Sequence, residues 1–86
     1  MTNTILKMMN GNGQRVYCII RKDADLTEEL KKVFSVSDGY GFTVEVNEAA
    51  VAIKDYFHGE NAATFKILSI EDTDEELMYY VKTIKD

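Results

Sequence analysis

Two runs of carboxylates are the part of the sequence with the clearest chemical potential. One run covers residues 71–76 (Glu-Asp-Thr-Asp-Glu-Glu), and the other comprises Asp23, Asp25, Glu28 and Glu29. Alternating carboxylates can ligate a metal ion, but a calcium-binding loop also needs a glycine at its turn and a late bidentate glutamate. Neither is present in the first run, so we expect no metal site and no cofactor.

The side chains that most often carry out catalysis do not form a recognisable constellation. His58 is the only histidine, and Cys18, the only cysteine, lies in an apolar segment typical of a buried thiol. No serine lies in a nucleophile-elbow context, and the glycines match neither a dinucleotide-binding loop nor a phosphate-binding loop. We therefore predict that the protein is not an enzyme.

Charge is unevenly distributed along the chain, whose net charge is -5. Residues 1–22 contain four basic residues and no acid, whereas the rest contains six bases and fifteen acids. Most acids lie at or just before predicted helix starts, where the helix dipole and free N–H groups favour carboxylates. Helix energetics therefore explains where the acids lie, but it does not explain their excess.

The excess of acid predicts a surface that docks on a basic, nucleic-acid-handling protein, because clustered carboxylates accelerate encounter with a basic groove. Tyr79 is expected to point away from the apolar stripe of a helix and to anchor this surface. The predicted protein-binding residues are Glu71, Asp72, Asp74, Glu75, Tyr79, Asp23, Asp25 and Glu29. A small acidic domain of this kind resembles phage and mobile-element inhibitors, such as anti-CRISPR proteins, in size and charge. We therefore expect an inhibitor or adaptor.

Length and cysteine usage indicate the organisation and compartment of the protein. The 86 residues suit a single domain, residues 1–86. One cysteine allows no internal disulfide, which favours a cytoplasmic location. The first residues lack the pattern of a signal peptide, and no apolar stretch approaches the roughly 20 residues that cross a bilayer.

A short segment resembles the third-strand signature of the RNA-recognition-motif family. Residues 39–42 (Gly-Tyr-Gly-Phe) match the core of that signature, and residues 16–18 (Val-Tyr-Cys) stand where the family carries an aromatic on its first strand. Asp38 and Glu45 stand where the family has a basic residue and a second stacking aromatic. The resemblance implies a βαββαβ fold and an RNA-binding sheet.

RNA binding is accordingly the alternative to protein docking. In this alternative, bases stack on aromatic side chains, and two arginines on the face of the same strand contact phosphates. The nucleic-acid-binding residues would be Arg15, Tyr17, Arg21, Tyr40 and Phe42. More often, arginines on such a strand pair with carboxylates of neighbouring elements, and we favour that role for Arg15 or Arg21.

The first half of the chain predicts a hairpin followed by a helix. Strands are expected at 4–9 and 14–21, because Asn-Gly-Asn-Gly between them tolerates the positive φ of a tight turn. Apolar residues at helical spacing predict a helix over 25–34, with Asp25 as its N-cap. Residues 33–37 offer a short strand that would shorten this helix.

The second half predicts a strand at 42–46, a helix at 47–58, a strand at 63–70 and a helix at 73–85. Asn47 and Thr73 are the expected N-caps of these helices, and Gly59 and Glu76 suit the end of one and the capping box of the other.

These elements give an α+β fold with the order β-β-α-(β)-β-α-β-α. A mixed or antiparallel sheet would pack against two or three helices, as in a ferredoxin-like variant. A strand–helix–strand segment with parallel strands would cross over in the right-handed sense. The Thr4–Met9 strand lacks proline and would be an open sheet edge, which favours a homodimer.

Overall fold

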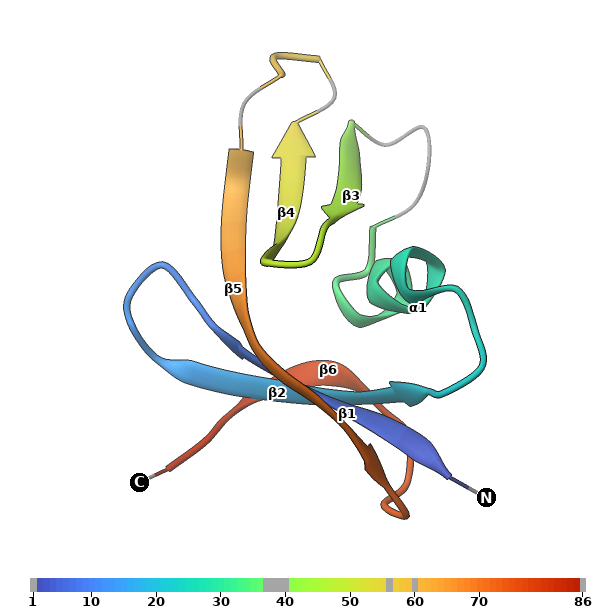
Figure 1. Ribbon diagram of the computed structural model, residues 1–86. Coiled ribbons are helices and arrows are strands. Elements are labelled where there is room, and N and C mark those ends of the chain that lie inside the picture. Colours follow the sequence, from blue (N-terminus) through green and yellow to red (C-terminus); the bar gives the residue numbers. More distant parts are fainter. Residues whose placement is uncertain (1, 37–40, 56, 60, 86) are drawn as a thin grey trace.

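A computed structural model describes residues 2–36, 41–55, 57–59 and 61–85. In these residues, six strands form one antiparallel sheet with the order β3-β4-β5-β1-β2-β6, and one helix packs against it (Figure 1). The elements are β1 (Asn3–Met9), β2 (Arg15–Arg21), α1 (Leu26–Val33), β3 (Phe42–Val46), β4 (Ala50–Asp55), β5 (Asn61–Thr73) and β6 (Met78–Thr83).

The predicted α+β fold with two or three helices is wrong. The described residues of the segments 47–58 and 73–85 form β-structure and turns rather than helices, so α1 is the only helix of the described residues. All strand pairs are antiparallel, which excludes both a right-handed crossover and a ferredoxin-like arrangement. The one helix is neither long enough nor apolar enough to cross a membrane.

The predicted N-terminal hairpin is confirmed. β1 pairs with β2 from Asn3 opposite Arg21 to Met9 opposite Arg15. In the turn between them, the Asn10 side-chain oxygen accepts hydrogen bonds of 3.0 Å from two N–H groups of the same turn. Gly13 has a φ of 79°, which a residue without a side chain adopts at no cost.

The predicted helix is also confirmed. The Asp25 carboxylate accepts hydrogen bonds from the N–H groups of Thr27 and Glu28, as an N-cap does. At the other end, Ser35 has a φ of 55°, and the Val36 N–H donates to the carbonyl oxygen five residues earlier. Residues 33–36 therefore form the end of the helix and not the short strand, and residue 37 lies outside the described residues.

The segment predicted as the second helix forms a turn and strand β4. The Asn47 side-chain oxygen accepts hydrogen bonds from Ala49 N–H (2.8 Å) and Ala50 N–H (2.9 Å), and the Asn47 N–H donates to the Ala50 carbonyl. This turn joins β3 to β4, with Val46 opposite Val51. Asparagine closes such a turn with the same hydrogen bonds by which it caps a helix. The asparagine at position 47 was therefore compatible with a turn as well as with a helix start.

A second turn of this type follows β4 at the position expected for a helix C-terminus. The Asp55 carboxylate accepts hydrogen bonds from the N–H groups of Phe57 and His58 and lies 2.9 Å from His58 Nδ1. The hydrogen bond with His58 holds the pKa of Asp55 below its ordinary value. Gly59 adopts the expected left-handed conformation, with a φ of 67°, but it ends a turn rather than a helix.

The segment predicted as the third helix forms the end of β5, a turn and strand β6. The Thr73 hydroxyl accepts a 3.3 Å hydrogen bond from the Glu75 N–H, which is the contact expected of a cap but here closes a turn between strands. β6 then pairs with β2, with Thr83 opposite Val16 and Met78 opposite Ile19.

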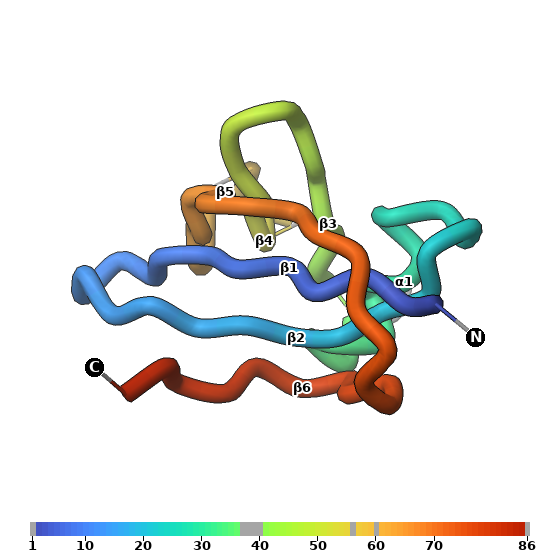
Figure 2. The backbone as a smooth tube through the Cα atoms, turned by 60° about the horizontal axis from the view of Figure 1, so that its bottom comes forward, coloured from blue at the N-terminus to red at the C-terminus, as the bar shows by residue number. Residues whose placement is uncertain are grey.

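β5 connects the two halves of the sheet, one formed by β3 and β4 and the other by β1, β2 and β6. Its residues 61–66 pair with β4 and its residues 66–73 pair with β1. The pairing shifts at Leu68, where β5 carries one extra residue, and the long strand passes from one half to the other (Figure 2). β1 is hydrogen-bonded to β2 and to β5, so the Thr4–Met9 segment is not an edge, and the predicted homodimer through it has no free strand to use.

The core lies in the angle between the two halves of the sheet, where α1 packs against β2, β3 and β6 (Figure 1). Because β3 and β6 are the two outermost strands, the helix connects both edges of the sheet. The buried hydrophobic residues of this cluster are Leu6, Met8, Val16, Cys18, Ile20, Leu30, Val33, Val44 and Val51.

Candidate functional site

The 71–76 acidic run and Asp23 of the other run lie at one end of the sheet. Asn3 lies opposite Thr73 of β5 on one side and opposite Arg21 of β2 on the other. The Lys22 Nζ atom, which follows β2, is 2.9 Å from the Asp72 carboxylate of β5. We call this region the acidic end, and its carboxylates are Asp23, Glu71, Asp72, Asp74, Glu75 and Glu76.

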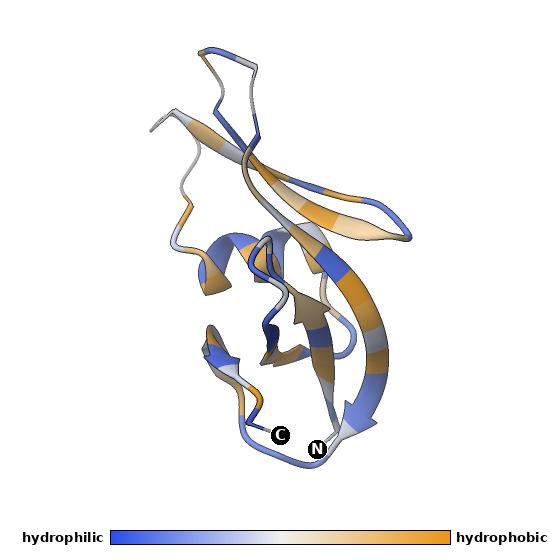
Figure 3. Cartoon of the chain, turned by 90° about the vertical axis from the view of Figure 1, so that its left-hand side faces the viewer, coloured by the Kyte–Doolittle hydropathy of each residue, from blue (hydrophilic) through white to orange (hydrophobic). Residues whose placement is uncertain are grey.

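The turn between β5 and β6 is held by hydrogen bonds to its backbone. The Asn3 side-chain amide donates a 2.8 Å hydrogen bond to the Glu75 carbonyl oxygen, and the Thr73 hydroxyl accepts from the Glu75 N–H. The Asp74 and Glu76 side chains are exposed and form no ion pair with the described residues. Figure 3 shows the hydrophilic end of β5 and this turn. The chain therefore presents carboxylates here on a defined backbone.

Lysines partly neutralise the acidic end. Besides the pair of Lys22 with Asp72, Lys7 Nζ lies 3.9 Å from the Glu71 carboxylate, and all four side chains are substantially exposed. The hydrogen bond that Lys22 donates to the Asp72 carboxylate raises the pKa of Lys22. Exposed pairs of this kind contribute little to stability and are screened by salt. The acidic end remains negative, because its other carboxylates have no such partner among the described residues.

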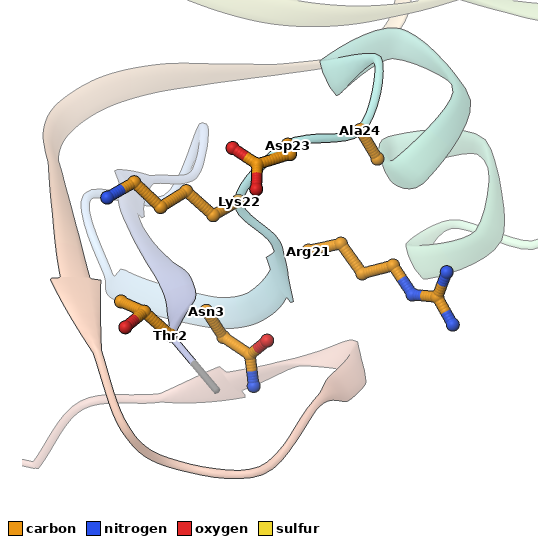
Figure 4. A pocket seen from close by; sticks show the side chains of 6 residues that line it. All are labelled: Thr2, Asn3, Arg21, Lys22, Asp23 and Ala24. Atoms are coloured by element: carbon orange, nitrogen blue, oxygen red, sulfur yellow. The ribbon is translucent and has the colours of Figure 1, made fainter.

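A shallow hollow lies beside the acidic end (Figure 4). It is lined by Thr2, Asn3, Arg21, Lys22, Asp23 and Ala24. The Arg21 side chain points away from those of Lys22 and Asp23 (Figure 4). The lining offers a hydroxyl, an amide and charges of both signs, which suits polar contacts with a partner and supplies no nucleophile paired with a base.

Glu29 is not part of the exposed acidic surface to which the sequence assigned it. Its side chain is only 1% exposed. One carboxylate oxygen accepts hydrogen bonds from the Arg21 N–H (3.0 Å) and the Tyr79 hydroxyl (2.8 Å), and the other accepts from Lys32 Nζ (2.9 Å). Glu29 therefore joins α1 to β2 and β6.

The three donors set the protonation state of this buried carboxyl group. Burial by itself raises the pKa of Glu29, but the hydrogen bonds from Lys32, Tyr79 and the Arg21 N–H together outweigh burial and hold the pKa below its ordinary value. Burial and the bond to Glu29 raise the pKa of Tyr79, and Glu29 also raises the pKa of Lys32. At neutral pH the group is thus a carboxylate bound by a phenol and an ammonium.

Tyr79 does not point outward as the helical prediction required. It lies on β6 where the pairing with β2 shifts, so that residues 79–81 stand opposite Cys18 alone. Its half-buried ring lies 5.5 Å from Lys32 Nζ, and its hydroxyl is bound to Glu29. Asp25 likewise has a structural task, because its carboxylate caps α1. Of the predicted docking residues, those of the 71–76 run, Asp23 and Asp25 are exposed, and Asp25 among them is already engaged as the cap of α1.

The arrangement that the RNA-recognition-motif resemblance implied is not present. Tyr17 lies on β2 and Phe42 on β3, which are separated by three strands in the sheet, and the fold is not βαββαβ. Tyr40 lies outside the described residues. The predicted aromatic residues therefore do not form one stacking surface between neighbouring strands.

Arg15, Tyr17 and Arg21 do share the outer face of β2, as the alternation predicted. Lys7 of β1 and Lys82 of β6 lie opposite Tyr17 on its two sides. Sequence reasoning missed this cross-strand row, because it placed Lys82 on a helix. The hairpin register alone was a usable signal for Lys7.

A second shallow hollow lies on the outer face, between β2 and the turn before β6. It is lined by Tyr17, Ile19, Glu75, Glu76, Leu77, Met78 and Tyr80. Tyr80 is 59% exposed here. The hollow combines aromatic and apolar side chains with carboxylates of the acidic end.

No group of three or more His, Cys, Asp or Glu side chains among the described residues is arranged to hold a metal ion. No known protein family, no characterised protein and no solved structure matches the chain.

Proposed function

We propose that the protein is a non-enzymatic binding protein whose acidic end docks on a basic surface of another protein. It would act on that protein as an inhibitor or as an adaptor. One observation carries the proposal. The 71–76 run and Asp23, about fifty residues apart in the sequence, lie at one end of the sheet, where Lys22 is paired with Asp72 and also feels the charge of Asp23. Helix energetics offers no alternative explanation for the 71–76 run, because this run lies on a strand and a turn.

The partner class follows from the sign and exposure of these charges. A surface with several unpaired carboxylates attracts a basic groove over a distance of about 8–10 Å at physiological salt. Basic grooves of this kind are common in proteins that handle nucleic acids. An acidic protein that occupies such a groove competes with the nucleic acid and acts as an inhibitor. The resemblance to anti-CRISPR proteins in size and charge is an analogy with this mode of action.

A cytoplasmic location is part of the proposal. Cys18 is fully buried and unpaired, and burial raises its pKa to about 12. The fold is thus built around a reduced thiol and without a disulfide, which suits a reducing compartment.

The test uses single-stranded DNA bound to a polylysine of about 20 residues as the basic probe, with displacement of the DNA followed by fluorescence anisotropy. The wild type is compared with the double variant Asp74→Asn/Glu76→Gln. The matched control is Glu45→Gln/Glu48→Gln, which changes the net charge equally but lies on β3 and in the turn that follows it.

We expect the acidic-end variant to need several-fold more protein for displacement at 50 mM salt, a difference that shrinks as salt screens the charges. The control should behave like the wild type. Equal losses in both variants would show that net charge alone acts, and no loss in the first variant would show that the acidic end is not the docking surface. Either result overturns the proposal.

A further inference from the structure

The C-terminal part of β5 has one open edge. On one side, residues 66–73 pair with β1, with the one shift at Leu68. On the other side, pairing with β4 ends at Lys66, and the last hydrogen bond is donated by the Ile67 N–H to the Ala49 carbonyl (2.9 Å). From Leu68 to Thr73, no strand of the described residues pairs with this edge. Every second residue of such an edge directs its N–H and C=O groups outward.

Ile70 is an exposed apolar residue beside this open edge. It lies opposite Leu6, so the two side chains share one face of the sheet. Leu6 is fully buried, whereas Ile70 is 54% exposed and Leu68, at the shift in pairing, is 41% exposed. An apolar residue on the core face remains exposed here because the sheet ends before another strand covers it.

We propose that the open edge of β5, residues 68–73, binds an extended basic segment of the partner protein as an added strand. This inference rests on the proposed function and adds to it the binding mode and the chemistry of the partner. The added strand would take up the outward N–H and C=O groups of β5 and would lay an apolar side chain against Ile70.

Charge selects a basic segment as the occupant. Glu71 and Asp72 lie on the two faces of the edge, because they stand opposite Ile5 and Thr4 of β1. The turn that follows adds Asp74. Lysine or arginine side chains of an added strand would lie beside these carboxylates, as opposite charges in cross-strand pairs do. Alternating basic and apolar residues therefore fit this edge.

The same charges disfavour a second copy of the chain. An antiparallel pair of two such edges, with residues 68–73 facing each other, would place Glu71 of each copy next to Ile70 of the other and bring four carboxylates of residues 71 and 72 together. Like charges in neighbouring positions on paired strands are destabilising. Self-pairing is thus the competing outcome that the test must detect.

The probe is a labelled eight-residue peptide of alternating lysine and valine, and binding is measured by fluorescence anisotropy. A twin peptide is N-methylated at every internal residue. This change keeps the charge of the peptide but removes the backbone N–H donors on both sides of its strand. We expect the affinity of the twin peptide to be lower by a factor of about ten or more, because several hydrogen bonds are lost. Equal binding of both peptides overturns strand addition while leaving charge-driven docking, and so the proposed function, intact.

The matched variants are Ile70→Lys and Tyr80→Lys. Ile70 and Tyr80 are similarly exposed, at 54% and 59%, and both changes add one positive charge. We expect Ile70→Lys to weaken binding of the peptide several-fold more than Tyr80→Lys does. Equal effects would overturn the inference. Light scattering on the wild type completes the test, because a dimer that Ile70→Lys dissociates would assign the edge to self-association instead.

Discussion

The hydroxyl of Tyr79 donates a 2.8 Å hydrogen bond to the carboxylate of Glu29, and this bond ties the edge strand β6 to α1. The same carboxylate oxygen accepts the Arg21 N–H at the end of β2. Two residues that the sequence suggested for a binding surface thus hold the edge of the sheet against its helix. The binding role that we propose falls on the neighbouring exposed carboxylates instead.

Tyr79→Phe should destabilise the fold by about 1–3 kcal/mol, because it leaves one buried acceptor position of Glu29 without its donor. Urea unfolding followed by circular dichroism measures the change. Tyr80→Phe is the matched control, and it should have almost no effect because this ring is 59% exposed. Equal stability of the Tyr79→Phe variant and the wild type would contradict the role given to this bond.

Glu29 should make stability depend on pH in the acid range. Its folded pKa lies below the ordinary value, so its contribution to stability is present above that ordinary value of about 4.3 and is lost as the pH falls through the folded pKa. Glu29→Gln should therefore be less stable than the wild type at pH 7, and the difference should shrink toward pH 3. Glu28→Gln is the same chemical change at a side chain 63% exposed, and at pH 7 it should cost less stability than Glu29→Gln. Urea midpoints across this range decide the matter.

Cys18 should be unreactive in the folded protein. Burial raises its pKa from 9.0 to about 12, so its thiolate fraction at pH 8 falls about a thousandfold, and its side chain is inaccessible. An aromatic disulfide reagent should modify it rapidly in urea and very slowly without urea. Because the folded pKa is raised, stability should also decline as the pH rises from about 9 toward 12, and Cys18→Ala should remove that part of the decline. Rapid modification of the native protein would refute the prediction.

Ser35→Gly should stabilise the protein by about 0.5–1 kcal/mol, because Ser35 ends α1 with a φ of 55°, where an L side chain is disfavoured. Ser69→Gly, in the middle of β5, is the control with the opposite expected sign, since glycine weakens a strand. A lower thermal midpoint for Ser35→Gly than for the wild type would show that the serine side chain makes a compensating contact.

Sequence reasoning succeeded where local signals agreed with each other. The Asn-Gly turn and the flanking alternation predicted β1 and β2, and the Asp25 cap with its apolar stripe predicted α1. It failed at Asn47 and Thr73, because the side chains of these residues close turns between strands with the hydrogen bonds that would otherwise cap helices. The short apolar segments after them were compatible with a helix or a strand. They form strands because β4 pairs with β5 and β6 pairs with β2, and both pairings are long-range.

The site was predictable only in part, for a related reason. The acidic composition of residues 71–76 was plain in the sequence, but its position beside Asp23 depends on the register of β5 against β1, which no local pattern encodes. Glu29 and Tyr79 are fifty residues apart, and nothing near either residue in the sequence indicates that they are hydrogen-bonded. The open edge of β5 likewise follows from where β4 ends.

The most direct test of the acidic end as the binding surface is a titration of ¹⁵N-labelled protein with the lysine–valine peptide, monitored through amide chemical shifts. We expect the largest changes at residues 68–76 and 22–25, with a gradual loss as salt is added. Changes centred instead on Tyr17, Ile19 and Met78 of the outer face, or spread evenly over the sheet, would contradict the account.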